Sequence, residues 1–173
     1  IGKCGVFSFQ HSKNITGGEG GIILSDDDEV AAMWRSIVNC GRMPGGVWYH
    51  HVNLGTHARL TEIQGAILSA QLTRLEEQTL RREKNAALLT AGLADIEDIR
   101  TQSGSAHITR RAYHLFCLRI DASRFGCSRE KFIQAANAEG LPICAGYPIP
   151  LYEQPVIEQW YCQRGIQRPD CPV

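Results

Sequence analysis

The sequence predicts a mixed α/β fold, because strand-like and helix-like segments alternate along its 173 residues. Residues 3–9 and 21–25 have the aromatic and aliphatic composition of strands, and they enclose a polar, glycine-rich turn. Residues 61–93 show a nearly unbroken helical pattern. A strand, a helix and a second strand are expected between residues 113 and 145, an order that is typical of a small α+β domain.

The first two predicted strands surround a single lysine. Phe7 and Phe9 alternate with Ser8 as in a half-buried strand, and Lys13 follows in the polar turn. Four glycines lie within residues 17–21; glycine tolerates positive φ angles and lets the backbone approach a ligand closely. A lysine held in such a turn is a candidate amine nucleophile or a point charge for a phosphate. The same pattern also fits a solvated lysine in an ordinary hairpin.

A helix and a long loop are expected next. Ser25 and the three aspartates after it predict a helix start, because serine caps helices and aspartate favours the positive end of the helix dipole. Apolar side chains such as Trp34 recur on one face, and Gly41 can end the helix. Residues 41–58 form a loop rich in glycine, histidine and aromatic residues. The adjacent histidines 50–51 have no third ligand at a suitable spacing, which makes them weak evidence for a metal.

The long helix begins at a capping-box pattern formed by Thr61 and Gln64. Residues 63–75 are apolar nearly all round, which suggests burial on both sides. A helical pattern of about thirty residues is long for a globular element and suits a connector between two domains. We therefore expect three parts, namely residues 1–60, the connecting helix 61–95 and a small α+β domain 96–173.

Composition argues against several classes of protein. Eighteen basic residues balance eighteen acidic ones, so the formal net charge is zero, unlike that of a nucleic-acid-binding or polybasic membrane surface. The sequence has no run of eighteen apolar residues and no signal-peptide pattern. Its seven cysteines are odd in number and form no C-x-x-C pair. We therefore expect free thiols in a reducing cytoplasm, with no zinc or other metal site.

Three stretches resemble the DegT/DnrJ/EryC1/StrS aminotransferases, pyridoxal-phosphate (PLP) enzymes that aminate keto-sugars and keto-cyclitols. The first is F-S-F-x-x-x-K at residues 7–13, which runs into G-E-G-G at 18–21. The second, at residues 54–66, is similar to the family's G-x-N-x-R-[ML]-[ST]-[DE]-x-Q-[AG]-A. The third, G-Y-P-I-P-L-Y at 146–152, resembles the family's Y-x-P-L-H region. They occur in the family's order and span nearly the whole chain.

The resemblance implies a fold and a set of site residues. The chain would be a fragment of a fold type I PLP aminotransferase, with the end of the large domain before the long helix and a truncated C-terminal domain after it. Lys13 would form the internal aldimine and move a proton between the substrate carbon and C4′ of the cofactor. Ser8 would bind the PLP phosphate. His57 stands where the family has an asparagine that reaches the partner's phosphate in a homodimer, and Tyr152 replaces a histidine.

The resemblance also implies substrates and a setting. The enzyme would transfer an amino group from an amino acid, glutamate or glutamine, to a nucleotide-linked keto-sugar or a keto-cyclitol in antibiotic or polysaccharide biosynthesis. The family's D-x-A-[HQ] motif, which supplies the acid partner of the pyridine nitrogen, does not occur in this sequence. We therefore expect the 173 residues to be an internal piece of a larger enzyme and inactive alone.

Other readings compete with this one. A catalytically silent relative, or an interaction or regulatory module built on the long helix, would carry the same motifs. A dehydratase of the family is a further alternative, but in those enzymes histidine replaces the lysine, and Lys13 argues against it. An α/β domain without either role is the plainest alternative. An upstream D-x-A-[HQ] motif in the complete reading frame would favour the aminotransferase.

Overall fold

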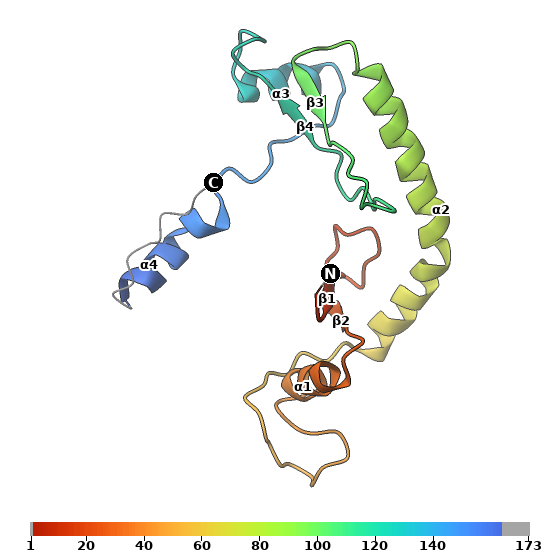
Figure 1. The fold of residues 1–173 in the computed structure, drawn as a ribbon, viewed down its shortest axis with the longest axis vertical. Helices are drawn as coiled ribbons and strands as arrows, with labels where there is room; N and C mark the ends of the chain where they lie inside the picture. The colour runs from red at the N-terminus through yellow and green to blue at the C-terminus, as the bar shows by residue number, and fades with distance from the viewer. Residues whose placement is uncertain (1, 164–173) are drawn as a thin grey trace. The chain divides into compact units, whose positions relative to one another are not determined.

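The structure, a computed structural model, describes residues 2–163 (Figure 1). It confirms the mixed α/β class. The elements in chain order are β1 (Gly5–Ser8), β2 (Gly21–Leu24), α1 (Asp28–Val38), α2 (Glu62–Gly92), β3 (Ile99–Thr101), β4 (Leu118–Ile120), α3 (Arg129–Ala138), the short 3₁₀ helix η1 (Leu151–Glu153) and α4 (Pro155–Gln163). In the described part, no helix is long and apolar enough to cross a membrane.

The described residues divide into two compact units. The first comprises the residues up to 95 together with 101–117, and the second comprises 96–100 and the residues from 118 onward. Strands β1 and β2 pair in the first unit, and β3 pairs with β4. That residues 61–95 connect two domains of a larger fold stays a prediction.

The hairpin β1–β2 has the strand-turn-strand form that the sequence predicted. The strands are antiparallel, and the register runs from Gly5 opposite Leu24 to Ser8 opposite Gly21. One further bond continues the ladder, since the Phe9 N–H donates to the Gly20 carbonyl at 2.8 Å. Phe9 is buried at the end of the pairing, so the connecting loop starts from a fixed point.

The N-cap of helix α1 lies two residues later than predicted. The prediction that Ser25 caps the helix is wrong, because Asp27 holds that position. The Asp27 carboxylate accepts the N–H groups of Glu29 and Val30, both at 3.1 Å. The Ser25 hydroxyl instead accepts the Asp27 N–H at 3.1 Å. Ser25 therefore orders the turn that presents the cap, while the aspartate satisfies the free N–H groups of the first helical turn.

Helix α2 has the predicted capping box, with Thr61 as the N-cap and Gln64 at the third helical position. Burial on both sides is not found in the described chain. Leu68 is 5% exposed, whereas Ile63 is 76% and Leu72 is 55% exposed. Only the side of the helix that faces the lysine hairpin is covered at this end.

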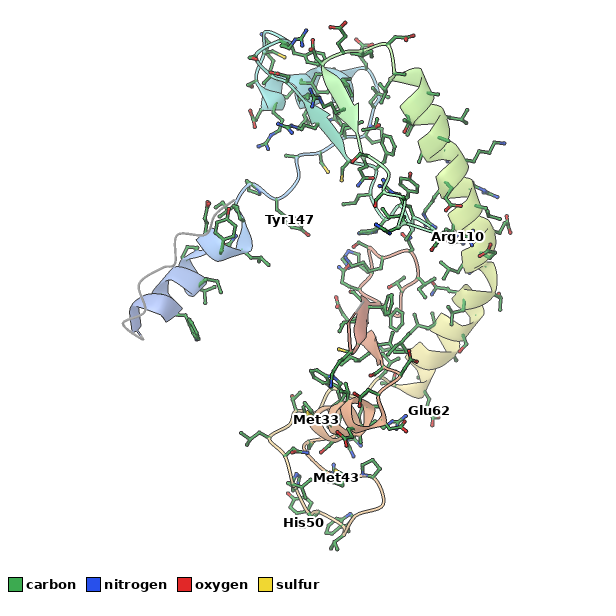
Figure 2. All side chains as sticks on the ribbon, viewed as in Figure 1. Met33, Met43, His50, Glu62, Arg110 and Tyr147 are labelled. Carbon is green, nitrogen blue, oxygen red and sulfur yellow. The ribbon has the colours of Figure 1, made fainter. Side chains whose placement is uncertain are left out.

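The segment 101–117 lies along α2 in the first unit. The Arg110 guanidinium contacts Glu76 at 2.8 Å and Glu83 at 3.6 Å, against the middle of α2 (Figure 2). The predicted strand from residue 113 forms only at 118–120. Tyr113 has a φ of 41°, which lies in the left-handed region and is incompatible with a strand at this residue.

The second unit contains one predicted cap and lacks one predicted strand. Ser128 caps α3 as expected, since its hydroxyl accepts the Lys131 N–H at 3.2 Å. Residues 141–145 do not form a strand. Their backbone groups bond locally, with the Asn137 amide donating to the Ile143 carbonyl at 2.9 Å and the Ile143 N–H donating back along the chain. Pairing with another strand requires free backbone N–H and C=O groups, so these local hydrogen bonds compete with strand formation at residues 141–145.

Much apolar surface remains uncovered. The solvent-accessible area of the chain is 14165 Å². A compact monomer of 19.2 kDa exposes roughly 8,400 Å². Two separate compact bodies of the same total mass expose roughly 10,000 Å². Among the described hydrophobic side chains, those that are buried are Phe9, Leu68 and Ala86. The buried hydrophobic side chains therefore lie on the lysine hairpin and on α2, which meet at Leu68.

Candidate functional site

Lys13 lies in the loop between β1 and β2 and is half buried. Its N–H donates to the Gln10 carbonyl at 2.9 Å, which forms a tight turn. The base of the loop is closed on Phe9, whose carbonyl accepts the Gly17 N–H at 3.0 Å and the Thr16 hydroxyl at 2.9 Å. Lys13 is thus carried on a small lobe, residues 10–15, whose two ends are held together.

The Lys13 amine has no protein partner within residues 2–163, where no hydrogen bond or ion pair engages its Nζ. The neighbouring polar side chains bond to one another instead. Gln10 Oε1 accepts the Ser12 hydroxyl at 2.7 Å, and Gln10 Nε2 lies 2.6 Å from His11 Nδ1. An amine that no carboxylate holds is available as a nucleophile or for a ligand.

The glycines after the lysine meet a steric need within the protein itself, whereas the predicted close approach of their backbone to a ligand stays a prediction. Gly20 has a φ of 123°, and a Cβ on it would lie 2.7 Å from Leu60 Cδ1. A Cβ on Gly21 would lie 2.8 Å from the Phe7 carbonyl oxygen. The Leu60 methyl can move aside, so at Gly20 the positive φ is the stronger constraint, whereas a side chain at Gly21 would push against the backbone of the paired strand.

Two glutamines of α2 attach the loop to the helix. Gln71 Oε1 accepts the Thr16 N–H at 3.0 Å, and Gln71 Nε2 donates to the Thr16 carbonyl at 2.6 Å. Gln64 Nε2 donates to the carbonyls of Gly17 at 3.1 Å and Glu19 at 2.9 Å. The sequence indicated Gln64 only as a helix cap and gave Gln71 no role. Their spacing of seven residues places them on one helix face, but the sequence does not show what that face meets.

Apolar packing lies between the two glutamines. Leu68 is buried on the same side of α2, and a Cβ on Gly17 would lie 3.5 Å from Leu68 Cδ1. The loop backbone therefore rests directly on this leucine. A third polar contact, which the sequence did not indicate, joins Asn14 to segment 101–117, with Asn14 Nδ2 donating to the Ala112 carbonyl at 2.8 Å.

Ser8 is the last residue of β1, on the same hairpin as Lys13, and its side chain is exposed. The Ser8 Oγ accepts the Gln10 N–H at 3.3 Å. This contact uses a lone pair and leaves the hydroxyl proton free to donate. Ser8 can therefore offer a hydrogen bond to an anionic group near the lysine loop.

His57 lies in the loop after α1, in the same unit as Lys13. The loop is joined to the end of α1 by a β-bridge between His57 and Asn39. The Arg59 guanidinium contacts His57 Nε2. Because arginine can only donate, Nε2 accepts in this contact, and the N–H of the ring is the one on Nδ1. His57 is exposed, so this N–H is available to a group outside the described chain.

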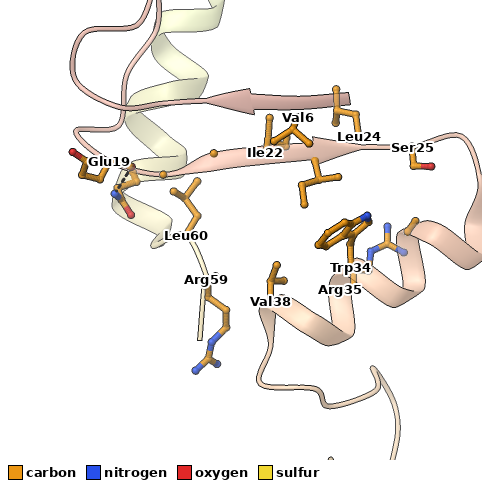
Figure 3. Close-up of a pocket in the computed structure, with 16 residues that line it drawn as sticks. Val6, Glu19, Ile22, Leu24, Ser25, Trp34, Arg35, Val38, Arg59 and Leu60 are labelled. Atoms are coloured by element: carbon orange, nitrogen blue, oxygen red, sulfur yellow. Dashed lines mark hydrogen bonds between the residues drawn. The ribbon is translucent and has the colours of Figure 1, made fainter. Parts of the chain in front are cut away.

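An apolar cleft of about 810 Å³ lies between the hairpin and α1 (Figure 3). Its lining includes Val6, Ile22, Leu24, Trp34, Val38 and Leu60. Lys13, Ser8 and His57 do not line it. The structure thus brings Ser8 and Lys13 together on one hairpin and places His57 on a separate loop, and the three residues do not share this cleft.

The histidine-rich loop does not provide a metal site in the described chain. The His51 Nδ1 donates to the Cys40 carbonyl at 2.6 Å, while His50 lies in the same long loop (Figure 2). Within residues 2–163, no three histidine, cysteine, aspartate or glutamate residues are grouped so that they could hold a metal ion.

Known proteins are similar to this chain in sequence and in fold. The chain is 36% identical to an L-glutamine:3-amino-2,3-dideoxy-scyllo-inosose aminotransferase of Streptomyces kanamyceticus, over 99% of this chain and 45% of that protein. It is 32% identical to a pleiotropic regulatory protein of Geobacillus stearothermophilus, over 90% of this chain and 40% of that one. The crystal structure of DesI with its TDP-sugar product superposes with a TM-score of 0.80 at 25% identity, over 100% of this chain and 41% of that chain.

The match to these relatives extends over nearly all of the 173 residues. The chain spans less than half the length of the relatives, 45% of the Streptomyces protein. The family model of the DegT/DnrJ/EryC1/StrS aminotransferases matches residues 1–170. The lysine loop, the long helix and the residues after it therefore all fall inside the match, and the chain belongs to the DegT/DnrJ/EryC1/StrS aminotransferase family.

Proposed function

We propose that this chain is part of a PLP-dependent aminotransferase that transfers an amino group from an amino acid to a keto-cyclitol or a nucleotide-linked keto-sugar. One observation carries the proposal. Lys13, in the F-S-F-x-x-x-K stretch that resembles the family's lysine segment, is half buried in a loop fixed at both ends, and its amine has no partner among the described residues. A lysine used only for a structural ion pair would have a carboxylate next to its amine.

The residues present suit PLP. The cofactor carries an aldehyde, a phosphate and a pyridine ring, and when bound it supplies an electron sink for negative charge developing at the substrate carbon. The unpaired Lys13 Nζ is the group to hold the aldehyde end, and in its neutral form it can take a proton from the substrate carbon and return it. The free hydroxyl proton of Ser8 and the Nδ1–H of His57 are donors suited to the phosphate.

The relatives suggest the substrates. The Streptomyces protein is named for L-glutamine as donor and for an aminated scyllo-inosose, a cyclitol, and DesI was solved with a TDP-sugar. We therefore propose L-glutamine or L-glutamate as the donor and a cyclic ketone, cyclitol or sugar, as the acceptor. Both acceptors are rich in hydroxyl groups, which polar side chains around the lysine loop can bind.

We also propose a homodimer. His57 is exposed on its loop with an N–H directed to no described partner, and α2, which follows this loop, carries exposed Ile63 and Ile67 on one face. A second copy that covered these side chains would bring His57 to the partner's cofactor. Sedimentation of the full-length protein at assay concentration should give a dimer, and an active monomer would contradict this proposal.

The activity is proposed for a polypeptide longer than these 173 residues. The chain matches 45% of the Streptomyces relative, and an acid partner for the pyridine nitrogen is expected in the rest. We expect residues 1–173 alone to convert PLP to its amine form no faster than free PLP does with the same donor. Conversion well above that rate would show a complete site within the chain.

A regulatory role is the second candidate, because one relative is named a pleiotropic regulatory protein. The two candidates differ in what the full-length protein does with substrates. An enzyme should consume L-glutamine only when PLP and a keto-cyclitol or nucleotide-linked keto-sugar are present. Lys13→Ala should lower that turnover by about a hundredfold or more, and Lys84→Ala should not. Turnover that survives Lys13→Ala would overturn the proposed role of the lysine, and no turnover with any such ketone would favour the regulatory role.

A further inference from the structure

We propose that Gln64 and Gln71 are positioning residues, which set the path of the lysine loop through their side-chain amides. The two glutamines are seven residues apart on α2, so their side chains point about 20° apart around the helix axis. Together they make four hydrogen bonds to the backbone of the loop residues Thr16, Gly17 and Glu19. The role of Lys13, which this loop carries, rests on the proposed function. The path of the loop backbone does not depend on that proposal.

Both amides use their donor and acceptor ends. Gln64 Oε1 accepts the Thr61 N–H at 3.1 Å while its Nε2 donates to two loop carbonyls. Gln71 pairs with both the N–H and the carbonyl of Thr16, as a neighbouring strand would. Exchanging oxygen and nitrogen in either amide would set donor against donor or acceptor against acceptor, so the network defines the orientation of both.

The held residues lie just after the lysine. Thr16 is three residues from Lys13, and its hydroxyl donates to the Phe9 carbonyl at 2.9 Å while accepting the Gly18 N–H at 2.9 Å. The position of Thr16 therefore fixes the base of the lobe that carries Lys13. A shift of α2 or of either amide would be passed to the Lys13 backbone through this residue.

The chemistry of the amide allows a specific test. A carboxylate has the shape of the amide but cannot donate. Gln71→Glu keeps the acceptor for the Thr16 N–H and places a charged oxygen against the Thr16 carbonyl. Protonation restores one donor, and that bond favours the neutral acid, so the introduced carboxyl has a raised pKa. The defect should therefore be present at about pH 8 and should fade toward about pH 5.

The readout is hydrogen exchange of backbone amides in residues 10–20 of the full-length protein without cofactor, compared with the unsubstituted protein at each pH. Gln64→Glu and Gln71→Glu should each speed exchange there on the order of tenfold at about pH 8, and the difference should shrink at about pH 5. Gln78→Glu is the matched control, since Gln78 lies a further seven residues along α2 and makes no hydrogen bond to the loop in the described chain.

A second control separates the contacts of the two glutamines to the loop from the capping of the helix. Thr61→Ala removes the capping hydroxyl but leaves both Nε2 donors, so it should loosen the helix start without the pH-dependent change in residues 10–20. Unchanged exchange in both glutamine variants would overturn the inference. An equal increase in exchange from Gln78→Glu would also overturn it. So would a uniform increase in exchange across all peptides together with a lower urea midpoint, because the glutamines would then stabilise the whole protein and not the loop path in particular. Loss of the proposed enzymatic function alone would leave this result standing.

Discussion

Truncation of Leu68 tests the packing that supports the lysine loop. Leu68 is 5% exposed and lies under the loop backbone at Gly17. Leu68→Ala removes about three carbons, which at about 0.8 kcal/mol each gives roughly 2.4 kcal/mol of lost transfer free energy. A cavity term adds to this, and measured leucine-to-alanine costs in cores are about 2–5 kcal/mol, so we expect about 3 kcal/mol.

Urea denaturation of the full-length protein, followed by tryptophan fluorescence, measures this cost. At a slope of about 2 kcal/mol per molar urea, the midpoint of the unit that contains Trp34 should fall by about 1.5 M. Leu68→Met keeps the side-chain volume and should cost less than about 1.5 kcal/mol. A cost below about 1 kcal/mol for Leu68→Ala would show that the loop does not rest on this side chain.

Four further substitutions test separate parts of the chain. Gly20→Ala should cost about 1–3 kcal/mol of unfolding free energy because of the positive φ, whereas Gly65→Ala, in open space on α2, should stabilise by about 0.5–1 kcal/mol; equal urea midpoints would refute this. The Ser123 hydroxyl lowers the pKa of Asp121, so this contact contributes stability above the ordinary aspartate range that is lost as pH falls through the lowered pKa. Ser123→Ala should raise that pKa, and a carboxyl titration by NMR that does not move would contradict the contact. His57→Ala should weaken PLP binding to the full-length protein, and an unchanged dissociation constant would remove His57 from the site.

The local patterns of the sequence predicted the parts of the fold that depend on nearby residues. The strand-like runs on both sides of the glycine-rich turn predicted the hairpin, because its two strands are consecutive in the sequence. The pattern from Thr61 to Gln64 predicted the capping box, which depends on residues three positions apart. Asp27 in place of Ser25 is a failure of the same kind of rule. Several polar residues stood at the helix start, and only geometry decides which carboxylate or hydroxyl reaches the free N–H groups.

Contacts between distant segments could not be predicted in this way. Gln71 is 55 residues from Thr16, and Asn14 is 98 residues from Ala112. An exposed glutamine on a helix has the same local pattern whether or not it meets a loop. The strand predicted at 141–145 is missing for a different reason. Its composition suits a strand, but the Asn137 side chain, only six residues away, binds the Ile143 carbonyl.

The proposed function depends most directly on Lys13 as the residue that holds the cofactor. The PLP-loaded full-length protein can be reduced with borohydride, digested and mapped for a pyridoxyl group by mass spectrometry. Other lysines of the chain, such as Lys84 on α2 and Lys131 on α3, serve as internal controls. We expect a label on Lys13 that disappears in Lys13→Ala. A label on Lys84 or Lys131 with Lys13 unmodified would contradict the proposed role of Lys13.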